Sequence, residues 1–109
     1  MKTNAQEKMK FIMSMAWMFV RKNGYTMSEA LKVSWNNWKL RKAMTEKIIR
    51  FCFRKVDGSV REAYGTLMSS MLPPTKGTGI TNPTTQVYYD IEKEQYRCFK
   101  KANLLSIAL

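Results

Sequence analysis

Lysine and arginine are the residues with the clearest capacity for binding chemistry in this chain, and they gather in one part of it. The 109 residues include 19 Lys and Arg against 8 Asp and Glu, for a formal net charge of +11. The densest stretch, residues 39–61, contains only two carboxylates, Glu46 and Asp57. Its cations are Lys39, Arg41, Lys42, Lys47, Arg50, Arg54, Lys55 and Arg61. Because such an excess attracts polyanions, these side chains are predicted to bind nucleic acid or another anionic partner.

The charge does not by itself identify the polyanion. Nucleic acid, an anionic membrane surface and an acidic protein surface all satisfy it, and a solvated basic face with no partner is the simplest alternative. Tyr64 and Tyr88 are predicted to be exposed near the basic residues, where aromatic rings stack on the bases of single strands. Nucleic acid is therefore the favoured partner, with an acidic protein surface as the alternative.

Catalytic and metal-binding patterns are absent from the sequence. It has no His, the commonest general base near neutral pH. Cys52 and Cys98 lack the spacing of a zinc site and are expected to be free thiols in a reducing compartment, the cytoplasm. Asp90, Glu92 and Glu94 lie at an expected turn, where solvated charge is the ordinary interpretation. We predict no catalytic residue, no metal, no cofactor and no enzymatic activity.

Two helices are expected to precede the rest of the domain. Helical spacing of apolar residues predicts the first over residues 4–23 and the second from Thr26 to about Met44, where Thr26 and Glu29 have capping-box spacing. The predicted apolar stripes are Met9, Ile12, Met13, Ala16, Trp17 and Val20, then Met27, Ala30, Leu31, Trp35 and Trp38. The short link between them predicts a helical hairpin.

Met15, Met18 and Phe19 extend the apolar surface of the first helix. They predict either a core that packs the hairpin against the barrel or an interface with a protein partner or a second copy of the chain. The apolar run 11–20 is too short to span a bilayer, so no membrane partner is expected. A helix-turn-helix is a weaker alternative, because Trp35 and Trp38 resemble core anchors rather than base readers.

Five strands are predicted after the composition changes at Thr45. They cover residues 47–56, 59–67, 85–91, 95–100 and 104–109, with Asp57-Gly58 as the turn of the first hairpin. Alternation places Arg50 and Arg54 on one strand face, and Arg61 is expected to approach them across the hairpin. Gly65 predicts a bulge or a bend. The Pro- and Gly-containing loop 68–84 is expected to cover one mouth of a barrel.

These elements predict an α+β fold, an N-terminal two-helix hairpin packed on a small five-stranded SH3-like (Sm-like) β-barrel. Residues 1–45 form the hairpin and residues 46–109 the barrel, as one compact unit.

Residues 47–109 carry a family resemblance in two segments, RFCFRKVDGSVREAYGTL and TNPTTQVYYDIEKEQYRCFKKANLLSI. They resemble small phage-associated Sm-like or SH3 β-barrel proteins related to the WYL barrel. Tyr89 and Tyr96 stand where the family usually has Phe and Trp. The resemblance implies the barrel fold, but the W-Y-L triplet is absent and its ligand site cannot be transferred. We therefore expect a non-enzymatic binding module of phage or mobile-element type that binds nucleic acid. The alternative is a protein-interaction module that inhibits or redirects a host protein such as a defence nuclease or polymerase.

Overall fold

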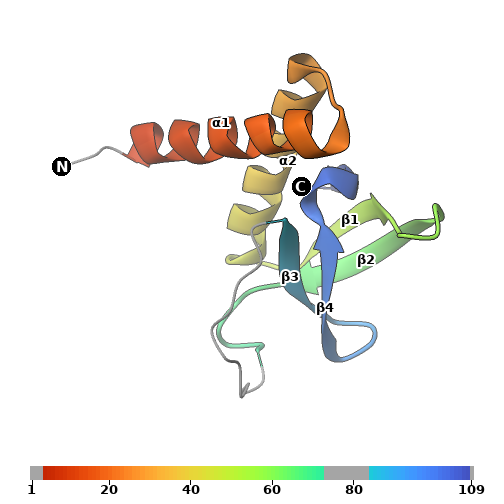
Figure 1. Ribbon diagram of the computed structural model, residues 1–109. Helices are drawn as coiled ribbons and strands as arrows, with labels where there is room; N and C mark the ends of the chain where they lie inside the picture. Colours follow the sequence, from red (N-terminus) through yellow and green to blue (C-terminus); the bar gives the residue numbers. More distant parts are fainter. Residues whose placement is uncertain (1–3, 73–83, 109) are drawn as a thin grey trace.

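The computed structural model describes residues 4–72 and 84–108 and contains two helices followed by five strands (Figure 1). All strand pairs are antiparallel, in the order β4-β3-β2-β1-β5. The predicted fold class is confirmed. The elements are α1 (Asn4–Asn23), α2 (Met27–Met44), β1 (Ile49–Arg54), β2 (Val60–Thr66), β3 (Thr85–Asp90), β4 (Gln95–Lys100), the 3-10 helix η1 (Lys101–Asn103) and β5 (Leu104–Ala108).

Helix α2 lies between α1 and the sheet, and this position decides which of its residues are buried (Figure 1). Its N-terminus is capped as predicted, because the Thr26 hydroxyl accepts a hydrogen bond from the Glu29 backbone N–H at 3.2 Å. The predicted stripe through Trp35 and Trp38 is wrong as the most buried face, since both rings are only half-buried. The most buried residues are Ala30, Ser34, Asn37, Leu40 and Met44.

Helix α1 covers the other side of α2. Its buried residues are Ile12, Met15, Ala16 and Phe19, whereas Met9 is 44% and Trp17 49% exposed. The predicted stripe is therefore wrong at Met9 and Trp17, because a single row of contacts with α2 leaves much of this apolar helix uncovered. No described helix is long and apolar enough to cross a bilayer.

The β1–β2 hairpin contains the expected turn, but its loop is one residue longer than a two-residue Asp-Gly turn. Gly58 N–H donates to Lys55 C=O at 2.9 Å, Lys55 N–H donates to Ser59 C=O at 2.7 Å, and Gly58 has a φ of 91°. This is a three-residue loop with a glycine in the left-handed region. It pairs Arg54 with Val60 and Phe53 with Arg61. A two-residue turn would have placed Arg61 opposite Arg54; a shift of one residue moves it to the other face.

The inner face of the sheet packs an aromatic cluster against α2. Phe51, Phe53, Tyr88 and Phe99 are buried with Leu40 and Met44 of the helix. The bulge predicted at Gly65 is absent from the β1–β2 pairing, since Gly65 pairs with Ile49 in regular register. A Cβ at this position would lie 2.7 Å from Tyr88 Cδ2 and 3.0 Å from Phe51 Cε1. The glycine is therefore required for the close approach of these rings to the β2 backbone.

The barrel is open along one seam. Strands β4 and β5 are the two edges of the sheet, and η1 connects them. The mouth-covering role predicted for the loop 68–84 falls largely on residues 73–83, which lie outside the described residues.

Candidate anion-binding pocket

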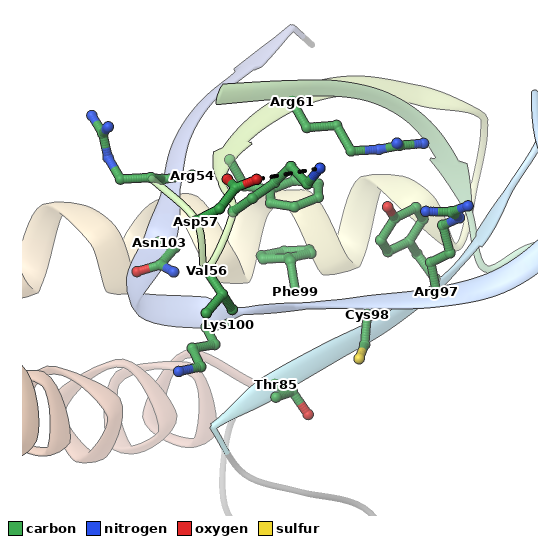
Figure 2. A pocket seen from close by; sticks show the side chains of 13 residues that line it. Arg54, Val56, Asp57, Arg61, Thr85, Arg97, Cys98, Phe99, Lys100 and Asn103 are labelled. Atoms are coloured by element: carbon green, nitrogen blue, oxygen red, sulfur yellow. Dashed lines mark ion pairs between the residues drawn. The ribbon is translucent and has the colours of Figure 1, made fainter. Parts of the chain in front are cut away.

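A pocket of about 670 Å³ lies between the tip of the β1–β2 hairpin and the edge strand β4 (Figure 2). Its inner wall is aromatic, but Phe53, Tyr88 and Phe99 expose at most 6% of their surface, so mainly ring edges border it. Its lining consists of Phe53, Arg54, Lys55, Val56, Asp57, Arg61, Thr85, Tyr88, Arg97, Cys98, Phe99, Lys100 and Asn103.

Cations dominate the polar lining. Arg54, Lys55, Arg61, Arg97 and Lys100 border the pocket, against a single lining carboxylate. That carboxylate, Asp57, is exposed and lies 4.0 Å from Lys55 Nζ. Hydrogen bonds from the Ser59 hydroxyl and backbone N–H lower the pKa of Asp57, with a smaller lowering from Lys55. The one carboxylate at the rim, Asp57, is therefore bound by Ser59 and Lys55 of its own turn. The pocket retains an excess of positive charge.

The rim has two ends with different surroundings. In Figure 2, Arg54 and Lys100 extend away from the pocket on the side opposite to Arg61 and Arg97. Arg54 donates to the Gly58 C=O at 2.8 Å and is otherwise exposed. Within residues 4–72 and 84–108, Lys100 forms no ion pair. These cations at the outer end are therefore accessible to a large anionic partner.

The other end is built around a buried carboxylate. Asp90 is 1% exposed, and its Oδ2 lies 3.0 Å from Arg61 Nη2 and 3.9 Å from Arg97 Nε. Its Oδ1 accepts the backbone N–H groups of Glu92 and Lys93 at 3.0 and 3.1 Å. Asp90 is therefore a structural residue that fixes two guanidinium groups and a turn. The expectation that it is a solvated charge at a turn was wrong.

Tyr88 lies beside these guanidinium groups. It is 0% exposed, and its hydroxyl has no hydrogen-bond partner among the described residues. Burial, reinforced by the charge of Asp90, raises the pKa of Tyr88 above its ordinary value of 10.0; Arg61 and Arg97 oppose this shift with smaller effects. The hydroxyl is therefore protonated at neutral pH and available as a donor. Its burial contradicts the prediction that the Tyr88 ring is exposed for stacking on bases.

Three of the eight predicted basic residues meet at the pocket, namely Arg54, Lys55 and Arg61. Arg61 reaches the pocket from the inner face and lines it together with Arg54, whereas its expected approach to Arg50 on the outer face is wrong. Arg50 is exposed opposite the half-buried Tyr64, away from the pocket lining. The remaining four are exposed on α2 or just after it and do not line the pocket; they are Lys39, Arg41, Lys42 and Lys47.

The predicted protein interface is largely internal. Met15 is 5% and Phe19 1% exposed, and both belong to a cluster that joins α1, α2 and η1, with Met18 packed against it. The core interpretation of these residues is confirmed. Exposed apolar surface on α1 lies instead at Met9 and Trp17.

Sequence reasoning missed Arg97 and Lys100, which lie outside the basic stretch 39–61. Alternation along β4 would have grouped Arg97 with Phe99 on the inner face. That signal, a cation in phase with a core residue, could have marked Arg97 as a pocket residue.

A helical hairpin packed against a five-stranded antiparallel sheet with an open, cation-lined seam defines a small barrel protein of the Sm-like SH3 type. Residues 37–105 match the family described as WYL_2, Sm-like SH3 beta-barrel fold, and the chain belongs to this family. The match begins within α2, ten residues before the segment in which the resemblance was noted. Comparisons with curated proteins and with solved structures gave no match.

Proposed function

We propose that this chain is a non-enzymatic binding module of the phage or mobile-element type, acting in the bacterial cytoplasm, and that it binds nucleic acid through the cationic rim of the pocket. The observation that supports this proposal is the gathering of five cations from two distant segments around one pocket with one exposed carboxylate. Phosphate binding requires cations along one surface, and each phosphate neutralised releases counterions.

The positive surface extends beyond the volume of a small ligand. A second hollow of about 300 Å³ shares Arg54 and Asn103 with the pocket. It adds Lys32 and one carboxylate, Glu29, from α2, so its two cations exceed its acidic charge by one. Arg54 therefore stands between two adjacent concave surfaces. A strand of nucleic acid lying across both places successive phosphates near Lys100, Arg54 and Lys32.

The aromatic rings of the pocket are nearly buried, and this determines how a nucleic-acid strand is expected to be bound. Phe53 and Phe99 expose 6% and 4% of their surface, too little for a base to stack on a ring face. Contacts are then mainly to phosphates, which position a strand without reading its sequence. We expect binding with little sequence preference.

The test compares two triple variants that remove the same charge. Arg54→Ala/Lys55→Ala/Lys100→Ala removes exposed rim cations, and Lys10→Ala/Arg21→Ala/Lys22→Ala removes exposed cations of α1. Fluorescence anisotropy with a labelled single-stranded oligonucleotide should show a much larger loss of affinity for the rim variant. Equal losses in the two variants would attribute binding to net charge and reject the rim as the site.

A second candidate function, binding a host protein such as a defence nuclease or polymerase, is supported by the exposed Met9 and Trp17 of α1. Apolar and aromatic side chains of this kind are enriched at protein interfaces. Affinity capture from nuclease-treated host lysate should then recover one protein in stoichiometric amount with the parent and lose it with Trp17→Ser. Capture of that protein by both would exclude the α1 surface.

A further inference from the structure

Two polar groups at the Arg61 end of the pocket lack a well-formed hydrogen bond among the described residues. The Tyr88 hydroxyl and Arg61 Nε are both buried and unpaired among the described residues. The Arg61 side chain lowers the pKa of Tyr88 through its charge and through a hydrogen-bonding contact with the hydroxyl, although this contact falls outside strict hydrogen-bonding geometry. Leaving a buried polar group unpaired costs about 1–3 kcal/mol. Because arginine only donates, the proton of the Tyr88 hydroxyl has no acceptor among the described residues, and this end of the pocket favours an added one.

The surrounding charge specifies an anionic acceptor. The guanidinium groups of Arg61 and Arg97 share one carboxylate, Asp90, so this end of the pocket keeps one uncompensated positive charge. Gln95 Oε1, with its amide oriented to accept, lies 2.7 Å from Arg97 Nη2 and holds that guanidinium in place. Arginine binds phosphate and carboxylate oxygens with several parallel N–H donors.

The donors are reached through the pocket. Both atoms are shielded from bulk water, but the side chains of Arg61 and Arg97 are 22% and 35% exposed. Arg61, Tyr88 and Arg97 all line the pocket, so a ligand bound there borders all three side chains. The ring of Tyr88 does not need to move, because Phe51, Phe53 and Phe99 hold it on three sides.

We propose that the end of the pocket formed by Arg61, Tyr88 and Arg97 receives a terminal phosphate of a nucleic-acid strand. This inference rests on the proposed function. A phosphomonoester carries a charge of about −1.5 to −2 at pH 7 and three acceptor oxygens, which suit two guanidinium groups and a hydroxyl. An internal phosphodiester carries one charge and is flanked by two sugars, so it would have to fold the strand into the pocket. The outer cations Arg54 and Lys100 then contact the phosphates that follow the end.

The experiment measures binding of short oligothymidylate strands that carry a 5′-phosphate, a 3′-phosphate or two hydroxyl ends. Thymidine 5′-monophosphate and inorganic phosphate are tested alongside, because the same phosphate chemistry occurs in free small molecules. The variant Tyr88→Phe deletes only the unpaired hydroxyl. Tyr89→Phe is the matched control, since Tyr89 packs against Tyr96 and does not line the pocket. Thermal unfolding establishes that both variants are folded.

We expect one phosphorylated end to bind about tenfold more tightly than hydroxyl ends, the value of one hydrogen bond to a charged group. Tyr88→Phe should remove most of this preference without changing the affinity for hydroxyl-ended strands, and Tyr89→Phe should retain it. Equal binding of all three strands overturns the terminal-phosphate site and leaves the proposed function intact. Binding of the free phosphates with no binding of any strand overturns both.

Discussion

Arg61 Nη2 donates to Asp90 Oδ2 across 3.0 Å and thereby links β2 to the end of β3 on the inner side of the barrel. The pair is 29 positions apart in the chain. Its carboxylate is 1% exposed, whereas Arg61 is 22% exposed and faces the pocket. The same arginine therefore stabilises the fold with one nitrogen, whereas its Nε has no well-formed hydrogen bond within the described part of the chain.

Removing the Arg61 charge should destabilise the protein. Arg61→Met leaves Asp90 buried with only the more distant Arg97, and we expect a loss of about 2 kcal/mol in the free energy of unfolding, below the usual cost of breaking a fully buried pair. Urea denaturation measures it. Arg50→Met is the matched control, because Arg50 is exposed and should cost under about 0.5 kcal/mol. Equal stability of the two variants would show that Asp90 does not need Arg61.

Tyr88→Phe should keep or increase the stability of the free protein. It removes a buried hydroxyl that has no well-formed hydrogen bond in residues 4–72 and 84–108 and leaves the ring contacts with Phe51 and Phe99 in place. The expected gain is up to about 1 kcal/mol, since the desolvation of an unpaired polar group is relieved. A loss of more than about 1 kcal/mol in urea denaturation would indicate that the hydroxyl is satisfied in the folded protein.

Gly65→Ala should be strongly destabilising for a steric reason. The added Cβ would lie 2.7 Å from Tyr88 Cδ2 and 3.0 Å from Phe51 Cε1, so both buried rings would have to shift, and we expect a loss of about 3 kcal/mol. Gly58→Ala is the comparison, because nothing lies within 4 Å there and only the positive φ of 91° opposes the change, at about 1 kcal/mol. If Gly65→Ala cost no more than Gly58→Ala in thermal unfolding, the close packing of Tyr88 on β2 would be wrong.

The rim cations should determine the salt dependence of binding to single strands. Each phosphate contact contributes about 0.7 to the slope of log affinity against log salt concentration. Removing Arg54, Lys55 and Lys100 together should therefore reduce the slope by up to about 2. Anisotropy titrations between low and physiological salt measure this. An unchanged slope would show that these three side chains do not contact phosphates.

Lys101 should make stability rise with pH in the alkaline range. The residue is 9% exposed, and burial, assisted by the charge of Arg41, lowers its pKa below the ordinary 10.5. Between the lowered pKa and 10.5 the unfolded chain binds more protons than the folded chain, so the free energy of unfolding increases as pH increases. Tyr88 acts in the opposite direction above pH 10.0, because its pKa is raised.

The contribution of Lys101 to the pH dependence of stability is measured by comparing the parent protein with a variant that lacks this lysine. Urea denaturation of the parent and of Lys101→Met across pH 8 to 10 should show the two proteins converging in stability as pH rises. Parallel profiles would mean that Lys101 is not perturbed. Lys101→Met should itself be no less stable at neutral pH, since methionine fills similar space over Phe11 without a charge.

Much of the fold was predictable because its signals are local. The bounds of α1, the cap at Thr26 and the strand β4 follow from capping residues and short-range periodicity. Alternation along β1 was also predicted correctly, since Arg50 and Arg54 share one strand face, which the structure shows to be the exposed one. These features depend on residues within one or two turns of each other.

The candidate site was predicted only in part, because it depends on register and on which faces meet. The basic stretch was recognised, and Arg54, Lys55 and Arg61 do reach the pocket. One extra residue in the hairpin loop moved Arg61 to the inner face, and neither composition nor turn chemistry determines that count. The apolar stripes of the helices were misassigned for a related reason, since α2 has to serve both α1 and the sheet.

The amino-acid sequence alone determined the order and type of the elements and the basic character of the chain. It also showed that the sequence lacks known catalytic motifs. Each of these features depends on composition or on neighbouring residues. Only the tertiary structure decided that Tyr88 is buried and that Arg61 pairs with Asp90. It also decided that Arg97 and Lys100 complete the pocket. Those relationships join residues far apart in the chain, and their formation depends on strand register and on the packing of rings against Gly65, which local patterns do not encode.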